Sequence, residues 1–149
     1  MAVRLQSEAF DTGAEIARLS AGRTDAGAVV SFTGLCRTDG ETGTISAMTL
    51  EHFPAMAEEE LGRIEAEARA RWPLMDVLIV HRYGRLVPGD PIVLVVTLSA
   101  HREAAFEAAN FLMDYLKTSA PFWKKEESAE GEQWVAAKHS DDTARERWR

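Results

Sequence analysis

Apolar and polar residues follow one another along the chain in short blocks, and these blocks predict a mixture of strands and helices. Runs rich in β-branched and aromatic residues indicate strands. We expect strands over residues 3–10, 27–35, 45–53, 77–83 and 92–98. The last of these, IVLVVTL, is the most apolar of the five, so we expect it near the centre of its sheet.

Apolar residues at helical spacing predict three helices, over residues 12–21, 54–72 and 102–118. The first helix begins with TGAE, which fits a capping box that starts at Thr12, and Gly22 follows its end. The third helix is expected to face the core through Phe106, Ala109, Met113 and Leu116.

The remaining segments indicate turns and a terminal hairpin. Residues 37–44 (RTDGETGT) are polar and predict a mobile loop, whereas 122–127 and 133–138 predict a hairpin. Because several connections are short turns, we expect an α+β fold with mostly antiparallel sheet. The length of 149 residues suits a single domain, with a charged tail from about residue 140.

Charge and cysteine content narrow the class of protein. The formal net charge of -7 argues against binding to nucleic acid or to an anionic membrane surface, because both would be repelled. The single cysteine excludes an intrachain disulfide and a cysteine-based zinc site. The chain also lacks a signal-peptide pattern and any run of about 18 apolar residues, so we expect a cytoplasmic protein.

Against this acidic background, the segment KTSAPFWKK holds Lys117, Lys124 and Lys125 with no acidic residue between them. Repulsion between clustered ammonium groups favours the neutral amine in one of them. That amine could act as a nucleophile or proton carrier, while its charged neighbours bind phosphate or carboxylate. The residues alone leave a simpler interpretation open, in which Lys117 complements a helix dipole and the other two lysines face solvent.

A second candidate anion site lies where the most apolar strand ends and the third helix begins. The free N–H groups of a helix N-terminus attract anions. Here Arg102 could bind a phosphate through two hydrogen bonds, and His101 could donate to an oxyanion. The pair could equally do no more than cover the helix start. Arg37 follows a strand directly and could either reach into a pocket or mark the exit of the strand into water.

The other candidate groups give weaker signals. His52 and His81 lie in apolar strands, and we expect both to be packed or hydrogen-bonded rather than catalytic. Cys36 has no activating pattern and is expected to be a small buried residue. The four histidines are scattered without the spacing of a metal site, and no phosphate-binding GxxxxGK[ST] motif is present. We therefore expect neither a metal ion nor a cofactor.

Five blocks of the chain carry a family resemblance. They are residues 27–37 (GAVVSFTGLCR), 50–56 (LEHFPAM), 81–90 (HRYGRLVPGD), 99–106 (SAHREAAF) and 114–126 (DYLKTSAPFWKKE). In this order they resemble the large catalytic subunit of the molybdopterin synthase family, over about residues 25–138. The sequence departs from the family pattern at Phe53 and Ala55, where Tyr and Gly are usual, and at Cys36, which is usually aliphatic.

The resemblance implies an α/β-hammerhead fold with an additional small antiparallel sheet. It also implies a sulfurtransferase that converts cyclic pyranopterin monophosphate into the dithiolene of molybdopterin. The sulfur would come from the C-terminal Gly-Gly thiocarboxylate of a small ubiquitin-like subunit. Two large subunits would form a homodimer with a small subunit at each end, as a heterotetramer.

The same resemblance assigns site residues by position. Lys117 matches the lysine beside the incoming thiocarboxylate, and Lys124 matches the second essential lysine. Arg37, His101 and Arg102 match positions that bind the pterin and its phosphate. The residues that flank these contacts are Leu35, Cys36, Lys125 and Glu126.

Two other functions are compatible with the residues. A Schiff-base lysine enzyme acting on a phosphorylated carbonyl compound would also need a lysine in a cationic pocket. The second is a non-catalytic adaptor, which would bind a ubiquitin-like protein without catalysing a reaction. The pair of lysines argues against the adaptor, which has no use for mutually repelling cations in a pocket.

Overall fold

The computed structural model describes residues 3–118, 122–135, 146 and 148. Its first sheet has the strand order β1-β6-β8-β2, and its pairs are antiparallel except for the parallel pair β1 and β6. The four strands are β1 Val3–Gln6, β6 Leu74–Arg82, β8 Pro91–Ser99 and β2 Ala28–Leu35. The prediction that residues 92–98 lie inside the sheet is confirmed, because β8 pairs with both β6 and β2.

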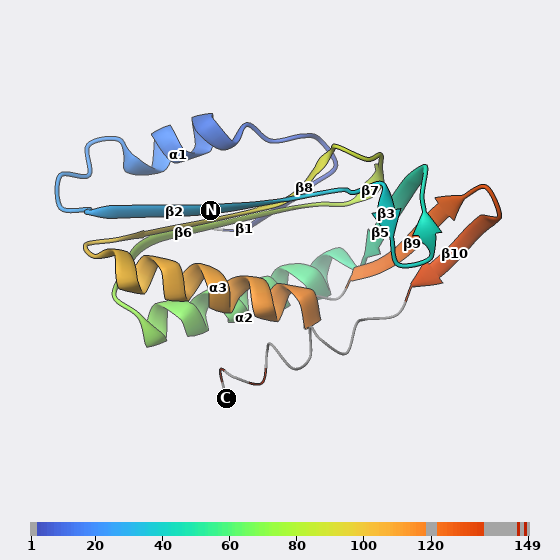
Figure 1. Cartoon of the computed structure of the whole chain (residues 1–149). Coiled ribbons are helices and arrows are strands. Elements are labelled where there is room, and N and C mark those ends of the chain that lie inside the picture. Colours follow the sequence, from blue (N-terminus) through green and yellow to red (C-terminus); the bar gives the residue numbers. More distant parts are fainter. Residues whose placement is uncertain (1–2, 119–121, 136–145, 147, 149) are drawn as a thin grey trace.

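Helices cover both faces of this sheet (Figure 1), which explains why its inner strands are apolar on every side. The helix α1 (Thr12–Ser20) covers one face, and α2 (Pro54–Arg71) and α3 (Arg102–Thr118) cover the other. Alternate residues of β6 serve the two cores: Leu78 packs with α1, and Ile79 packs with α2 and α3. Such burial on both faces stabilises the sheet as a rigid support.

A second sheet lies at one end of the first (Figure 1), beside the end of α3. Its strand order is β10-β9-β5-β7, and all of its pairs are antiparallel. The strands are β5 Ala47–His52, β7 Gly84–Leu86, β9 Phe122–Ser128 and β10 Gly131–Val135. The expected α+β class, with mostly antiparallel sheet and an additional small antiparallel sheet, is confirmed.

The structure differs from the sequence prediction in several local features. The strand expected over residues 3–10 ends at Gln6, and the short strand β7 was not expected. The N-cap of α1 is Asp11 rather than Thr12, since Asp11 Oδ1 accepts a hydrogen bond from the Ala14 N–H at 3.0 Å. Residues expected to form a loop include the short hairpin of β3 (Asp39–Gly40) and β4 (Gly43–Thr44). Phe106 is 61% exposed instead of facing the core, because the buried face of α3 runs through Ala105, Ala109, Leu112 and Leu116.

Parts of two other predictions fall outside the described residues. The hairpin was expected to continue to residue 138, and the description of β10 ends at Val135. Of the charged tail predicted from about residue 140, only residues 146 and 148 are described. Trp148 contacts the core, with its ring centroid 5.6 Å from those of Trp72 and Phe111. Within the described ranges, no helix is both long and apolar enough to cross a membrane.

Candidate active site

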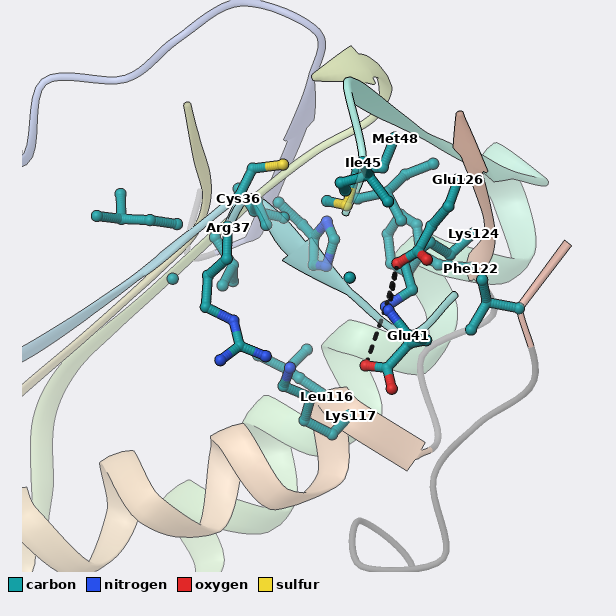
Figure 2. A pocket seen from close by; sticks show the side chains of 18 of the residues that line it. Cys36, Arg37, Glu41, Ile45, Met48, Leu116, Lys117, Phe122, Lys124 and Glu126 are labelled. Atoms are coloured by element: carbon teal, nitrogen blue, oxygen red, sulfur yellow. Dashed lines mark hydrogen bonds and ion pairs between the residues drawn. The ribbon is translucent and has the colours of Figure 1, made fainter. Parts of the chain in front are cut away.

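A cavity of about 320 Å³ lies where the two sheets meet the last turn of α3. Its walls come from the end of β2, the β3–β4 hairpin, the inner face of the second sheet and α3 (Figure 2). This volume is at the lower end of the range for small-ligand sites. In the described part of the chain, no group of three or more His, Cys, Asp or Glu residues could hold a metal ion.

Two of the three lysines of the KTSAPFWKK segment reach this cavity, and they come from different elements. Lys117 extends from the last turn of α3, and Lys124 extends from β9. Alternation along β9 turns Phe122, Lys124 and Glu126 towards the cavity. The next lysine, Lys125, therefore faces away from it.

Lys124 is held between two carboxylates. Its Nζ lies 3.7 Å from Glu41 Oε1 and 4.0 Å from Glu126 Oε2, as the dashed lines in Figure 2 mark. Glu126 is only 2% exposed. The backbone N–H of Glu41 donates to it at 3.0 Å, and the N–H and hydroxyl of Thr42 donate at 2.8 and 2.7 Å. Glu126 thus joins β9 to the β3–β4 hairpin.

The charge of Glu126 follows from these contacts. Burial would raise the pKa of this carboxyl, but the hydrogen bonds from Glu41 and Thr42 and the charge of Lys124 together hold it below its usual value. Glu126 is therefore ionised at neutral pH. Gly40 permits this contact, since a Cβ there would lie 2.5 Å from Glu126 Oε2.

The end of β2 supplies the opposite wall. Leu35, Cys36 and Arg37 all line the cavity, and Arg37 is an exposed cation that extends towards the end of α3 that carries Lys117 (Figure 2). Cys36 is held by its backbone, since its N–H donates to the Asp90 carbonyl at 2.8 Å. Burial raises the pKa of the Cys36 thiol, and the charges of Asp90 and Glu126 act in the same direction. This cysteine is consequently a neutral thiol at neutral pH.

Six of the nine predicted site residues line the cavity, and three do not. His101 and Arg102 are exposed at the start of α3, about 22 Å from Lys117 along the helix axis. Lys125 faces the other side of the second sheet, where its Nζ is 3.4 Å from Glu132 Oε2. Within one copy of the chain, Arg37, Lys117 and Lys124 therefore meet at the cavity, whereas the candidate anion site at the start of α3 lies apart from it.

Several cavity residues were not proposed from the sequence. They are Glu41, which pairs with Lys124, and His81 and Phe122, whose rings stack with centroids 3.9 Å apart. His81 was expected to be packed or hydrogen-bonded, and it is both. Its position at the end of an apolar strand was the available signal, but the strand pattern does not show that its ring reaches a cavity.

Comparison with known proteins establishes the family. The family model described as "MoaE protein" matches residues 5–119. The chain is a member of the MoaE family. The resemblance inferred from the five sequence blocks is thereby confirmed.

Relatives of this MoaE-family chain match it over nearly its whole length. The "Molybdopterin synthase catalytic subunit" of Mesorhizobium japonicum is 60% identical, over 99% of this chain and 92% of that protein. A structure of the "Molybdopterin biosynthesis MoaE protein" from Burkholderia ambifaria has a TM-score of 0.84 and 50% identity, covering 99% of this chain and 98% of that one. The molybdopterin synthase structure from Staphylococcus aureus has a TM-score of 0.81 and 32% identity, covering 89% and 96%.

Proposed function

We propose that the chain is the catalytic subunit of a molybdopterin synthase. It would transfer sulfur from the C-terminal thiocarboxylate of a small ubiquitin-like subunit to cyclic pyranopterin monophosphate. The observation that carries this proposal is the meeting of Lys117 and Lys124 in one cavity of a protein with net charge -7. The names of its near relatives supply the reaction class, because they designate the catalytic subunit of this enzyme.

The cavity residues suggest a division of roles. Arg37 would bind the anionic part of the substrate at the mouth of the cavity. Attack of the thiocarboxylate sulfur on the pterin would join tail and pterin as a thioester, and water would then break the bond between the acyl carbon and sulfur, releasing the tail as a carboxylate. Lys124, held between Glu41 and Glu126, would polarise this carbonyl and stabilise the oxyanion that develops as water adds. Lys117 forms no ion pair within the described residues, and it would lie beside the incoming tail and move protons as sulfur attacks the pterin.

A second copy of the chain would supply the distant basic residues. β2 is an edge strand, and the apolar side chains of Val29, Phe32 and Leu35 are 39%, 43% and 56% exposed along it. An uncovered edge of this kind favours pairing with another strand. Two copies paired through antiparallel β2 strands would bury these side chains in a homodimer.

The geometry of that pairing fits the site. The start of β2 lies beside the start of α3, since Gly27 N–H donates to the Ser99 carbonyl, and the cavity lies at the other end of β2. β2 is about 24 Å long, close to the axial separation of Arg102 from Lys117. Antiparallel pairing would therefore bring His101 and Arg102 of a second copy towards the cavity, where they would bind the substrate phosphate.

Turnover of cyclic pyranopterin monophosphate tests the proposal. We expect molybdopterin to form only when the thiocarboxylated small subunit is present. Lys117→Ala should lower turnover by about 100-fold or more, because it removes a group that acts in the transition state. Lys125→Ala is the matched control, since this lysine faces away from the cavity.

Two results would contradict the proposed function. One is near-normal turnover by Lys117→Ala with the thiocarboxylated partner. The other is borohydride trapping of substrate on Lys117 with no need for a partner, which would identify a Schiff-base enzyme instead.

A further inference from the structure

His81 is a buried histidine to which the mechanism above gives no role. It lies near the end of β6, is only 8% exposed, and lines the cavity that holds the two lysines. Its ring stacks on that of Phe122, with an angle of 13° between the planes. Phe122 lines the same cavity, so the stacked pair forms an aromatic part of its wall beside the cations.

The hydrogen bond at one ring nitrogen defines the tautomer of His81. Nδ1 lies 2.9 Å from the carbonyl oxygen of Arg82. Because a carbonyl oxygen can only accept a hydrogen bond, Nδ1 must carry the proton and donate it. In the neutral ring the other nitrogen, Nε2, then has a free lone pair and can only accept.

The ring is neutral under ordinary conditions. Burial is the largest of the effects that lower the pKa of His81 to about 4. The hydrogen bond to the Arg82 carbonyl opposes this shift, and the charges of His52 and Lys117 add to it. At neutral pH, His81 therefore presents an acceptor and no positive charge.

The surroundings of His81 are rich in hydrogen-bond donors. Arg37, Lys117 and Lys124 line the same cavity and can only donate when charged. Three carboxylates also line the cavity. Glu126 already accepts three hydrogen bonds from the β3–β4 hairpin, Glu41 is paired with Lys124, and Asp39 is exposed on the hairpin. The cations suit the phosphate of a substrate, but they cannot accept from the N–H groups of a pterin ring.

We propose that His81 Nε2 accepts a hydrogen bond from a ring N–H or amino group of the pterin, so that the His81–Phe122 wall is the subsite for its nitrogen ring system. This inference rests on the proposed function, since it takes the pterin phosphate as the substrate. The phosphate is then bound by the cations, and the ring system is oriented by the histidine.

Binding measurements on variants test the subsite. Calorimetry should show about a tenfold or greater loss of affinity for cyclic pyranopterin monophosphate in His81→Phe, which keeps a stacked ring and removes the acceptor. His81→Gln, which returns a carbonyl oxygen near the position of Nε2, should recover part of this loss. Inorganic phosphate should inhibit the turnover of both variants and of the wild-type protein at the same concentration.

His52→Phe is the matched control, because His52 also contacts Phe122, at 5.6 Å between centroids, without lining the cavity. It should bind the pterin phosphate as the wild-type protein does. Equal pterin affinity in His81→Phe and the wild type would overturn the subsite. Failure of the wild-type protein itself to bind the pterin would contradict the proposed function as well.

A measurement on the unaltered protein decides the matter even where a variant does not fold. In protein with ¹⁵N-labelled histidine, NMR should show His81 with a protonated Nδ1 and a bare Nε2. The Nε2 signal should shift on addition of the pterin phosphate and not on addition of inorganic phosphate. A protonated Nε2, or an unchanged signal in the pterin complex, would overturn the inference.

Discussion

The two lysines of the cavity have opposite surroundings. Beside Lys124 lies a buried carboxylate, Glu126, which is kept charged by hydrogen bonds from the β3–β4 hairpin. On the side of Lys117 lies a buried imidazole, His81, which is kept neutral. Lys124 is consequently compensated by the protein, whereas the charge of Lys117 has no carboxylate partner among the described residues. Two lysines in one pocket are thus prepared for different tasks.

Removal of Glu126 should have the largest effect, because it takes from Lys124 the buried carboxylate that distinguishes its surroundings from those of Lys117. Glu126→Ala leaves three donors of the hairpin without their acceptor, and Lys124 without its buried partner. We expect the free energy of unfolding to fall by about 3 kcal/mol, as measured in urea, and turnover to be lost because Lys124 is no longer held. A variant with wild-type stability would show that the hairpin does not depend on this carboxylate.

Lowering the pH should destabilise the protein through His81, the neutral group on the side of Lys117. Its pKa in the folded protein is lowered to about 4 from 6.5, so the unfolded chain binds the proton more readily. The free energy of unfolding should therefore fall as pH drops from 6.5 to 4, by up to about 3 kcal/mol from this group. In His81→Phe this part of the pH dependence should be absent in urea titrations at several pH values. An unchanged pH profile would contradict a buried neutral histidine.

Replacement of each lysine by Met should separate their structural roles. Lys124→Met leaves the buried Glu126 carboxylate without its cation and should lower the free energy of unfolding by about 1–2 kcal/mol. Lys117→Met should change it by less than about 0.5 kcal/mol. Both variants should lose turnover. Equal losses in the free energy of unfolding would show that Lys124 is no more important to the stability of the fold than Lys117.

The smallest effect is expected at Lys125, the neighbour of Lys124 on the other face of β9. Its ammonium lies near Glu132 and 5.5 Å from the ring centroid of Trp134, away from the cavity. Lys125→Ala should lower the free energy of unfolding by at most about 0.5 kcal/mol and leave turnover unchanged. Thermal unfolding and the turnover assay on the same preparation check both parts.

The sequence predicted the elements better than it predicted the site. Strand and helix periodicity placed β8 and α3 correctly, because burial on one or both faces leaves a repeat that can be read locally. The alternation of β9 separates Lys124 from Lys125 but does not indicate which of them faces a cavity. That choice depends on pairing with β5, which is more than 70 residues away in the chain.

Other features of the site depend on contacts that leave no local pattern. The role of Glu126 follows from hydrogen bonds to residues 84 and 85 positions earlier in the chain. His101 and Arg102 lie far from the cavity of their own chain, and a family resemblance aligns residues without showing where in space they lie. The tautomer of His81 depends on a single backbone carbonyl.

The link between Glu126 and the hairpin also bears on when the site forms during synthesis. All four strands of the first sheet are complete by Ser99, so this sheet is synthesised before the second sheet is complete. The carboxylate that closes the wall arrives only with β9, after more than four fifths of the 149 residues have been made. A nascent chain therefore contains every strand of its scaffold before it contains the residue that closes the cavity.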